Sequence, residues 1–540
     1  MKKYGWLIWA LLVALMTLLF WYAFQENLRG FFSSDALYLP SLYRDLFEDG
    51  YTLNGWTLNQ ASNFFPDMLL FFPLNALFGD FVMATFWYSV IQYFAIIYIF
   101  YLIFKQCKPN LHLSTFTVAI LIFASFPFTL FIDNIHYVSA HLFHNSYHNS
   151  AFIMALVCIY LFCKYLNTKS LKTLIPVLIL SVLGGACDKL FFICFTIPVT
   201  LVVIVLFFIH KDRKTLIKFL VFLAIGTLGA VALWIFFKNN PYFSLTKPYG
   251  AITEAYIKDS WLTFSKQLHR YLTKFSYIGV LTWFSIFSYL AVTIYVFKKT
   301  YKLIKEKSRA DALFVFELFV LFFTPIVLFA PVLAGSYDNA TSIRYNYFPY
   351  LLLPFNSVIL ASSWLNKNKL YNTVLNAALS LFIVGYLLIH FPVKEFGKEM
   401  NRVFNFYPEK ARIIDGYFSD GETLKYGITN EYWTAKHATM FSKKGVRLHC
   451  VFRGGYPWVH VANKHWFIDH DKGKHAHCEF TYLLWSKGEE IPEFFKTANP
   501  DVQPIDLGNW DLYQVVPYRF VWQNNRMEPV LIDTLYRLKE

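Results

Sequence analysis

Long apolar runs, separated by short polar segments, fill the first 391 residues of the chain. A helix needs about 20 apolar residues to cross a hydrocarbon core of about 30 Å. Eleven runs meet this length or nearly so, and the pattern therefore predicts eleven membrane spans. The fifth run is short, and only Asp188 and Lys189 separate it from the sixth. The predicted spans cover residues 5–24, 82–104, 113–132, 150–166, 173–187, 190–209, 215–237, 278–298, 313–333, 347–364 and 371–391.

The pattern changes after residue 391. Apolar runs become short, and turn residues and charged side chains become more frequent. Runs at 446–452, 480–485 and 510–516 predict strands, and the segments 491–498 and 528–539 predict helices. A stretch of about 150 residues is a usual size for one domain. We therefore predict an α-helical polytopic domain over residues 1–391 and a soluble α+β domain over residues 392–540.

An amphipathic stretch follows the first predicted span. Its apolar residues recur at helical spacing, polar residues occupy the other side, and Gly50 provides a stop. Such a helix can lie in the membrane interface. The apolar positions are Leu39, Leu42, Tyr43, Leu46 and Phe47, and the polar ones are Arg44, Asp45 and Glu48.

Composition supports a membrane protein. Of the 540 residues, 56% are hydrophobic, against about 45–50% in soluble domains. The N-terminal MKKYGWLIW resembles a signal peptide at first, but it lacks a small-residue cleavage site and its apolar run is long. We therefore expect a retained anchor rather than a cleaved segment.

The net charge of +14 is distributed among alternate loops. It is not gathered in one patch, so nothing indicates nucleic-acid binding. Loop 133–149 has no Lys or Arg, loop 184–190 has only Lys189, and loop 334–346 has only Arg344. Because basic loops stay cytoplasmic, we expect a protein of the inner (plasma) membrane with a cytoplasmic N-terminus. Loop 25–81 and the C-terminal domain are then extracytoplasmic, as an odd number of spans requires.

Two carboxylates of the first outer loop are candidates for chemistry. A charge this close to hydrocarbon costs a few kcal/mol unless it faces a cavity or a partner. Asp35 is either such a functional acid or a helix cap after Ser33-Ser34. Asp67, within Phe64-Phe65-Pro66-Asp67, is either a second acid or a charge that favours the dipole at a helix N-terminus.

Polar groups also interrupt the apolar pattern at two later places. Asp188-Lys189 is either an intramembrane functional pair or a plain turn between two spans. Loop 133–149 is rich in histidine, which can bind a metal, contact a phosphate or sugar, or cap span ends. Its histidines are His136, His141, His144 and His148.

The segment SIRYNYFPYLLLP at 342–354 places Arg344 and Tyr345 at the entry of a late span. The guanidinium of Arg344 presents a planar fork that fits a phosphate bidentately. The alternative is an arginine that extends to the interface with no ligand.

Asp35 with the helix that follows it, and Arg344-Tyr345 followed by Pro349, resemble membrane glycosyltransferases of the GT-C fold. The likeness is to the superfamily of protein mannosyltransferases and aminoarabinose transferases. It implies that Asp35 is the catalytic carboxylate and that Arg344 holds the phosphate of a polyprenyl-phosphate sugar. No Asp-Asp or Asp-Glu pair adjoins Asp35, as it does in some members, so use of a divalent metal and the acceptor class stay open.

The expected reaction is inverting transfer of a hexose or pentose from the lipid carrier to a glycan, lipid or protein acceptor. Asp35 acts as general base, fixed positive charge stabilises the leaving phosphate, and the C-terminal domain orients the acceptor. The rivals are a transporter, which would carry polar residues near the midplane, and a non-catalytic envelope-assembly protein. The candidate substrate-binding residues are Arg44, Asp67, His136, His141, Asp188, Lys189, Arg344 and Tyr345.

The C-terminal domain holds two cysteines, Cys450 and Cys478. An oxidising compartment permits a disulfide between them, and the alternative is two free buried thiols. Nearby residues of the same domain form either a zinc site or a solvated, histidine-rich loop. They are His465, His470, His475, His477 and Cys478.

We further expect Asp35, His136 or His141, Asp188 and Arg344 to line one outward cavity that opens to lipid beside helix 39–49.

Overall fold

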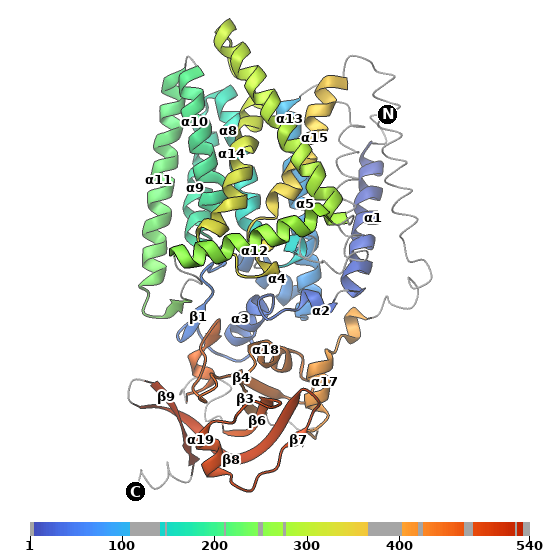
Figure 1. The fold of residues 1–540 in the computed structure, drawn as a ribbon, viewed down its shortest axis with the longest axis vertical. Coiled ribbons are helices and arrows are strands. Elements are labelled where there is room, and N and C mark those ends of the chain that lie inside the picture. Colours follow the sequence, from blue (N-terminus) through green and yellow to red (C-terminus); the bar gives the residue numbers. More distant parts are fainter. Residues whose placement is uncertain are drawn as a thin grey trace.

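The computed structural model describes two regions of different character (Figure 1). A bundle of long helices occupies one end, and a sheet domain from the C-terminal part of the chain occupies the other. The described residues are 5–26, 28–108, 141–145, 148–209, 212–246, 252–273, 277–365, 402–419, 425–468, 479–523 and 526–532.

The bundle helices run side by side along the long axis in Figure 1. Six of the described helices are long and apolar enough to cross a membrane, and four further apolar helices are shorter. The predicted spans 113–132 and 371–391 lie outside the described residues, so the count of eleven stays a prediction. The bundle helices are α1 (Gly5–Glu26), α5 (Phe81–Cys107), α8 (Asn149–Thr168), α9 (Leu171–Cys187), η3 with α10 (Phe192–Thr196 and Ile197–Ile209), α11 (Arg213–Lys238), α13 (Tyr277–Glu306), α14 (Ala312–Leu333) and α15 (Phe348–Leu365).

The outer face of α11 shows why the bundle suits a membrane. Six of its large apolar side chains, spread along its length, are about half exposed or more. In water such a stripe would leave several hundred Å² of apolar surface uncovered, whereas lipid tails cover it. The stripe consists of Ile217, Val221, Ile225, Leu228, Ile235 and Phe236.

The loop 238–277 contains regular structure that its length and charge did not suggest. It forms β2 (Phe243–Leu245) and the amphipathic α12 (Glu254–Thr273), which crosses the bundle transversely in Figure 1. Phe264 of α12 is buried against Tyr337, and Ser260 Oγ accepts a hydrogen bond from the Tyr337 N–H at 3.1 Å. This helix therefore braces the loop that leads to Arg344.

The segment between α1 and α5 forms a layer between the bundle and the sheet domain. It comprises α2 (Leu28–Phe31), α3 (Tyr38–Phe47), β1 (Trp56–Leu58) and, after the π-helix η2 (Phe64–Met68), α4 (Leu69–Phe78). The predicted helix 39–49 is confirmed as α3, with its bounds shifted by one or two residues. Its Tyr43 ring contacts Phe72 of α4 at 5.6 Å between centroids.

Two polar residues of α3, Arg44 and Asp45, contact the sheet domain. Arg44 Nη1 donates to the Thr439 carbonyl at 2.8 Å, and Asp45 accepts hydrogen bonds from Asn463 and Trp466. The helix is thus enclosed by protein on this side, which the pattern of a single helix could not reveal.

The C-terminal domain is built on a six-stranded mixed sheet. Its order is β4 (Val446–Cys450), β3 (Lys425–Thr429), β6 (Phe480–Ser486), β8 (Trp510–Gln523) and β7 (Ile505–Asp506), with β9 (Arg526–Leu531) also paired to β8. The strands β3, β4 and β6 are parallel, and β8 is antiparallel to β6. Its helices are α17 (Glu409–Asp415), α18 (Tyr432–Phe441) and α19 (Glu493–Ala498).

Most elements predicted in this domain are confirmed. The strands expected at 446–452, 480–485 and 510–516 correspond to β4, β6 and β8, and the helix at 491–498 contains α19. The helix expected at 528–539 is wrong at its start, because residues 526–531 pair with β8 as an outer strand. Residues 533–540 and the expected domain boundary at 391 lie outside the described residues.

A small three-stranded sheet fastens the domain to the bundle end. Its order is β2, β1, β5, with β5 (Ala462–Asn463) from the C-terminal domain antiparallel to β1. Gly55 makes this junction possible, since its φ is +89° and a Cβ there would lie 2.3 Å from His465. The domain is therefore held against the loop that carries Asp35.

Candidate functional site

Asp35 and Arg344, which are 309 positions apart in the sequence, are in contact. Arg344 Nη1 lies 3.2 Å from Asp35 Oδ2, and the side chains are 26% and 31% exposed. Arg344 belongs to the 3₁₀ helix η4 (Ala340–Tyr345), and Asp35 to the turn between α2 and α3. The structure therefore brings the predicted acid and the predicted phosphate ligand together at one end of the bundle.

The local fold of residues 33–38 leaves the Asp35 side chain available for this contact. Ser33 supplies the turn: its Oγ accepts from the Ala36 N–H at 3.3 Å, and its carbonyl accepts from the Leu37 N–H at 3.0 Å. Backbone and serine groups thus start α3, and the Asp35 carboxylate accepts from Arg344. The Asp35 side chain therefore does not cap a helix.

Polar contacts extend from Arg344 along the bundle end. Arg344 Nη2 donates to the Tyr345 hydroxyl at 3.0 Å, and the Tyr345 ring lies 5.4 Å from the ring of His148. His148 Nδ1 lies 2.7 Å from Asp188 Oδ2. Asp188 also accepts from the Leu190 N–H at 2.9 Å, which holds the chain at the break between α9 and α10. Asp188 therefore pairs with His148 and not with Lys189.

His141 lies beneath this surface. It is buried, and its burial lowers its pKa well below the usual value, with His144 and Arg344 adding to the effect. A neutral His141 can offer a hydrogen bond but no charge to a ligand. His136 lies outside the described residues.

Asp67 is a buried group that joins three helices. Its carboxylate accepts from Ser150 Oγ at 2.9 Å and from the Tyr88 hydroxyl, and its side chain is 2% exposed. These contacts tie η2 to α5 and α8, close to His148. Asp67 therefore supports the elements that carry the site and does not reach the Asp35 surface.

Two candidate residues point elsewhere. Lys189 Nζ lies 4.1 Å over the Trp234 ring of α11, away from the Arg344 contacts. Arg44 lies between α3 and α18, where it also approaches Asp49 at 3.7 Å. Their polar character was recognised from the sequence, but their direction depends on tertiary packing.

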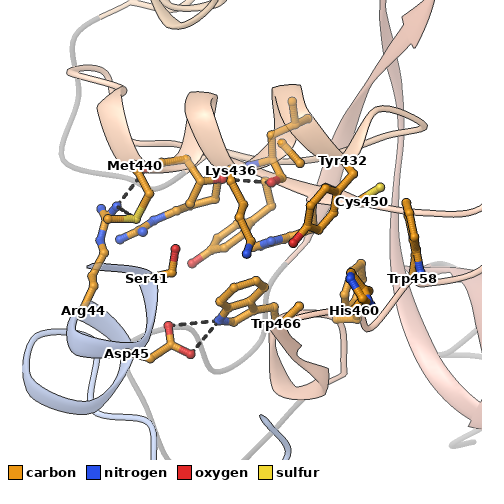
Figure 2. A pocket seen from close by; sticks show the side chains of 18 of the residues that line it. Ser41, Arg44, Asp45, Tyr432, Lys436, Met440, Cys450, Trp458, His460 and Trp466 are labelled. Carbon is orange, nitrogen blue, oxygen red and sulfur yellow. Dashed lines mark hydrogen bonds between the residues drawn. The ribbon is translucent and has the colours of Figure 1, made fainter. Parts of the chain in front are cut away.

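A cavity of about 40 Å³ lies between α3 and the C-terminal domain (Figure 2). Lys436 of α18 lines it and donates to the carbonyl of Ser34 at 3.4 Å. Burial lowers the pKa of Lys436 to about 8, although the Asp35 carboxylate partly opposes this shift. Sequence reasoning missed this lysine, since a Lys within a helix is usually solvated. The other lining residues labelled in Figure 2 are Ser41, Arg44, Asp45, Tyr432, Met440, Cys450, Trp458, His460 and Trp466.

No metal site is evident within the part of the chain that the structure describes, where no group of three or more His, Cys, Asp or Glu is suitably placed. His465 is buried at the junction with Gly55, while His470, His475, His477 and Cys478 lie outside the described residues. Cys450 is buried. Because Cys478 lies outside the described residues, the disulfide between the two stays a prediction.

Comparison with known proteins gives no assignment, because neither a family model nor a curated protein matches this chain. The function must therefore be argued from the site itself.

Proposed function

We propose that the protein is a membrane glycosyltransferase that moves a sugar from a polyprenyl-phosphate carrier to an envelope acceptor, with inversion at the anomeric carbon. The observation that carries the proposal is the contact between Asp35 and Arg344. An acid that can take a proton and a guanidinium that can hold a phosphate stand side by side, partly exposed, at the end of an apolar bundle. This is the pair of groups that displacement of a sugar phosphate requires.

In the proposed reaction Asp35 accepts the proton of the acceptor hydroxyl. The hydroxyl oxygen forms a bond to the anomeric carbon as the bond from that carbon to the phosphate oxygen breaks. The leaving phosphate gains negative charge, which Arg344 stabilises with fixed N–H donors. A guanidinium has five N–H groups, so Arg344 can bind a phosphate oxygen while another nitrogen still faces Asp35.

His148 is the group best placed to assist. Its ring lies 5.4 Å from the Tyr345 ring, and Asp188 fixes its orientation through Nδ1. Nε2 faces away from Asp188, and it donates to a phosphate oxygen when the imidazole carries a proton on both nitrogens. In this proposal Asp188 is a positioning residue.

Apolar surface beside α3 supports a lipid-borne donor. Phe47 at the end of α3 and Leu69 and Leu77 of α4 are more than half exposed. A prenyl chain that stayed in the bilayer could lie along these side chains with its phosphate at the bundle end. The distribution of basic loops supports placing this end outside the cytoplasm.

Replacement of Asp35 by Asn tests the proposal, because it removes the base and keeps the shape. A strain lacking the protein is complemented with the wild type, Asp35→Asn or Asp80→Asn, and its envelope glycans and lipid-linked sugars are measured by mass spectrometry. Asp80 is the matched control, since it caps α5 through the Val82 N–H and Asn caps equally well. We expect loss of one glycosylated product and accumulation of its lipid-linked donor in Asp35→Asn alone.

Two outcomes would contradict the proposal. Restoration of the product by a normally folded Asp35→Asn protein would remove Asp35 from the chemistry and favour a non-catalytic assembly role. An unchanged set of glycans and lipid-linked sugars in the deletion strain would argue against glycosyl transfer altogether.

A further inference from the structure

The cavity between α3 and the C-terminal domain is lined by more cations than carboxylates. Three basic side chains reach it, Arg44 from α3, Lys436 from α18 and Arg447 from β4. The acids are Asp45 and Asp49. Figure 2 shows side chains of α3 and α18 facing each other across this space.

Asp49 is shared by two of the three cations. Its carboxylate lies 3.3 Å from Arg447 Nη2 and 3.7 Å from Arg44 Nε. Arg447 is buried, and among the described residues its Nε donates no hydrogen bond. One carboxylate therefore shares its negative charge between two guanidinium groups and neutralises neither of them completely.

Asp45 contributes less negative charge than its formal count. Burial raises the pKa of this carboxyl group to about 7, despite the hydrogen bonds from Asn463 and Trp466. Even with both carboxylates ionised, the three basic side chains outnumber them, so the cavity carries a net positive charge.

Lys436 is the cation with the poorest compensation. It is 5% exposed, and its described contacts are the Ser34 carbonyl at 3.4 Å and the face of the Tyr432 ring at 5.1 Å. Neither carries a full negative charge, and the Asp35 carboxylate acts on Lys436 electrostatically without a described contact. A buried ammonium group with no anion in direct contact is costly, which indicates that an anionic ligand supplies the missing contact.

The volume and the walls define the ligand further. A water-sized group needs roughly 10–15 Å³, so about 40 Å³ accommodates a few such groups, as in a carboxylate or a phosphate. Three aromatic rings lie beside Lys436. The centroid of the Trp458 ring is 5.3 Å from that of Tyr432 and 5.5 Å from that of His460. Such faces suit the apolar side of a ring attached to the anionic group.

We propose that this cavity is a binding site for an acidic group, either a carboxylate or a phosphate, held by Lys436 with Arg447 and Arg44. Because the Ser34 carbonyl that contacts Lys436 adjoins Asp35, the bound molecule lies next to the proposed base. That the molecule is the acceptor, and hence that acidic acceptors are selected, rests on the proposed function. The anion site itself does not.

The test is thermal unfolding of the full-length protein in detergent, with inorganic phosphate, D-glucuronate or neutral glucose added at constant ionic strength. A ligand that binds only the folded state raises the midpoint in a saturable way. We expect phosphate, glucuronate or both to raise the wild-type midpoint and glucose to leave it unchanged. A response to phosphate alone identifies a phosphate ligand, and a response to glucuronate alone identifies a carboxylate.

Lys436→Met is the decisive variant. We expect it to lose the anion response while its ligand-free midpoint stays equal or rises, since a poorly compensated buried charge has been removed. The matched control is Lys410→Met on α17, whose ammonium donates to Thr434 at 2.9 Å outside the cavity. It should keep the full response.

Several results would overturn the anion site. They are an unchanged response in Lys436→Met, no response of the wild type to either anion, and a response equally strong with glucose. If Lys436→Met does not fold, Lys436→Gln keeps a donor for the Ser34 carbonyl without the charge, and a normal response in that variant refutes the site. Asp35→Asn should bind the anion at least as tightly as the wild type, so the binding test stands apart from any failure of glycosyl transfer.

Discussion

Exchange of the charges at positions 35 and 344 distinguishes a catalytic pair from a structural one. The single variants Asp35→Arg and Arg344→Asp each place like charges together, and the double variant restores opposite charges in reversed order. If the pair only joins η4 to the turn before α3, the double variant should recover both stability and activity. If Asp35 is a base and Arg344 a phosphate ligand, it should recover stability alone.

The expected loss of stability is small. At the observed 3.2 Å, Coulomb's law gives about 1.3 kcal/mol at the dielectric constant of water and about 5 kcal/mol at an effective value of 20. Both side chains are about one quarter to one third exposed, so screening and side-chain ordering reduce the net contribution to about 0–1 kcal/mol. The unfolding midpoint of a protein of this size should therefore change by a few degrees at most.

The expected loss of activity is much larger. Removal of a single preorganised donor to a developing oxyanion costs about 10²–10³ in rate, and loss of a general base costs about 10²–10⁴. In the double variant an arginine cannot accept the proton, and an aspartate repels the phosphate, so both losses persist. Thermal unfolding and product analysis by mass spectrometry measure the two quantities on the same preparations. Recovery of activity to within tenfold of the wild type in the double variant would refute the catalytic assignment.

Three further predictions address the junction and the topology. First, the folded-state pKa of Asp45 is raised from 3.8 to about 7, so its contribution to stability is fully present below pH 3.8 and declines as the pH rises towards 7. The decline is at most about 4 kcal/mol, and Asp45→Asn should flatten the dependence of the unfolding midpoint between pH 5 and 8. An equally steep profile in the variant would contradict this assignment. Second, Gly55→Ala should lower the unfolding midpoint and increase hydrogen exchange of β5, because its Cβ would collide with His465. The control Gly79→Ala, also at positive φ but with nothing within 4 Å, should leave β5 protected. Equal exchange in the two variants would show that the collision is relieved. Third, a reporter fused after Lys369 should be cytoplasmic and one after Glu540 extracytoplasmic, while a cytoplasmic C-terminus would overturn the orientation inferred from loop charge.

Features governed by local pattern were predictable from the sequence. The amphipathic spacing at 39–49 gives α3, and the short apolar runs that begin at residues 446, 480 and 510 give β4, β6 and β8. Asp35 and Arg344 were recognisable as candidates because each is an ionisable residue beside a long apolar run. A charge at that position needs a partner, and in the structure Asp35 and Arg344 are each other's partner.

Features that depend on the packing of distant segments were not predictable. The strand pairing of β1 with β5 joins positions separated by about 400 residues through only two paired positions, too few to leave a pattern. Residues 528–531 form part of β9 because β8 extends to Gln523 and offers a free edge there. Lys436 is the clearest case, since only the docking of α18 on residues 32–34 removes its ammonium group from water.

Asp35 lies between two cations that come from different parts of the fold. Arg344 contacts it from the bundle, and Lys436, which donates to the neighbouring Ser34 carbonyl, is coupled to it electrostatically from the C-terminal domain. In the proposed reaction the donor phosphate competes with Asp35 for Arg344, and an anion in the cavity competes with it for Lys436. Each ligand thus takes up one cation that otherwise faces the carboxylate. Under this proposal Asp35 is free to contact the acceptor hydroxyl when both the bundle side and the domain side are occupied, and the loop that carries it lies between the two.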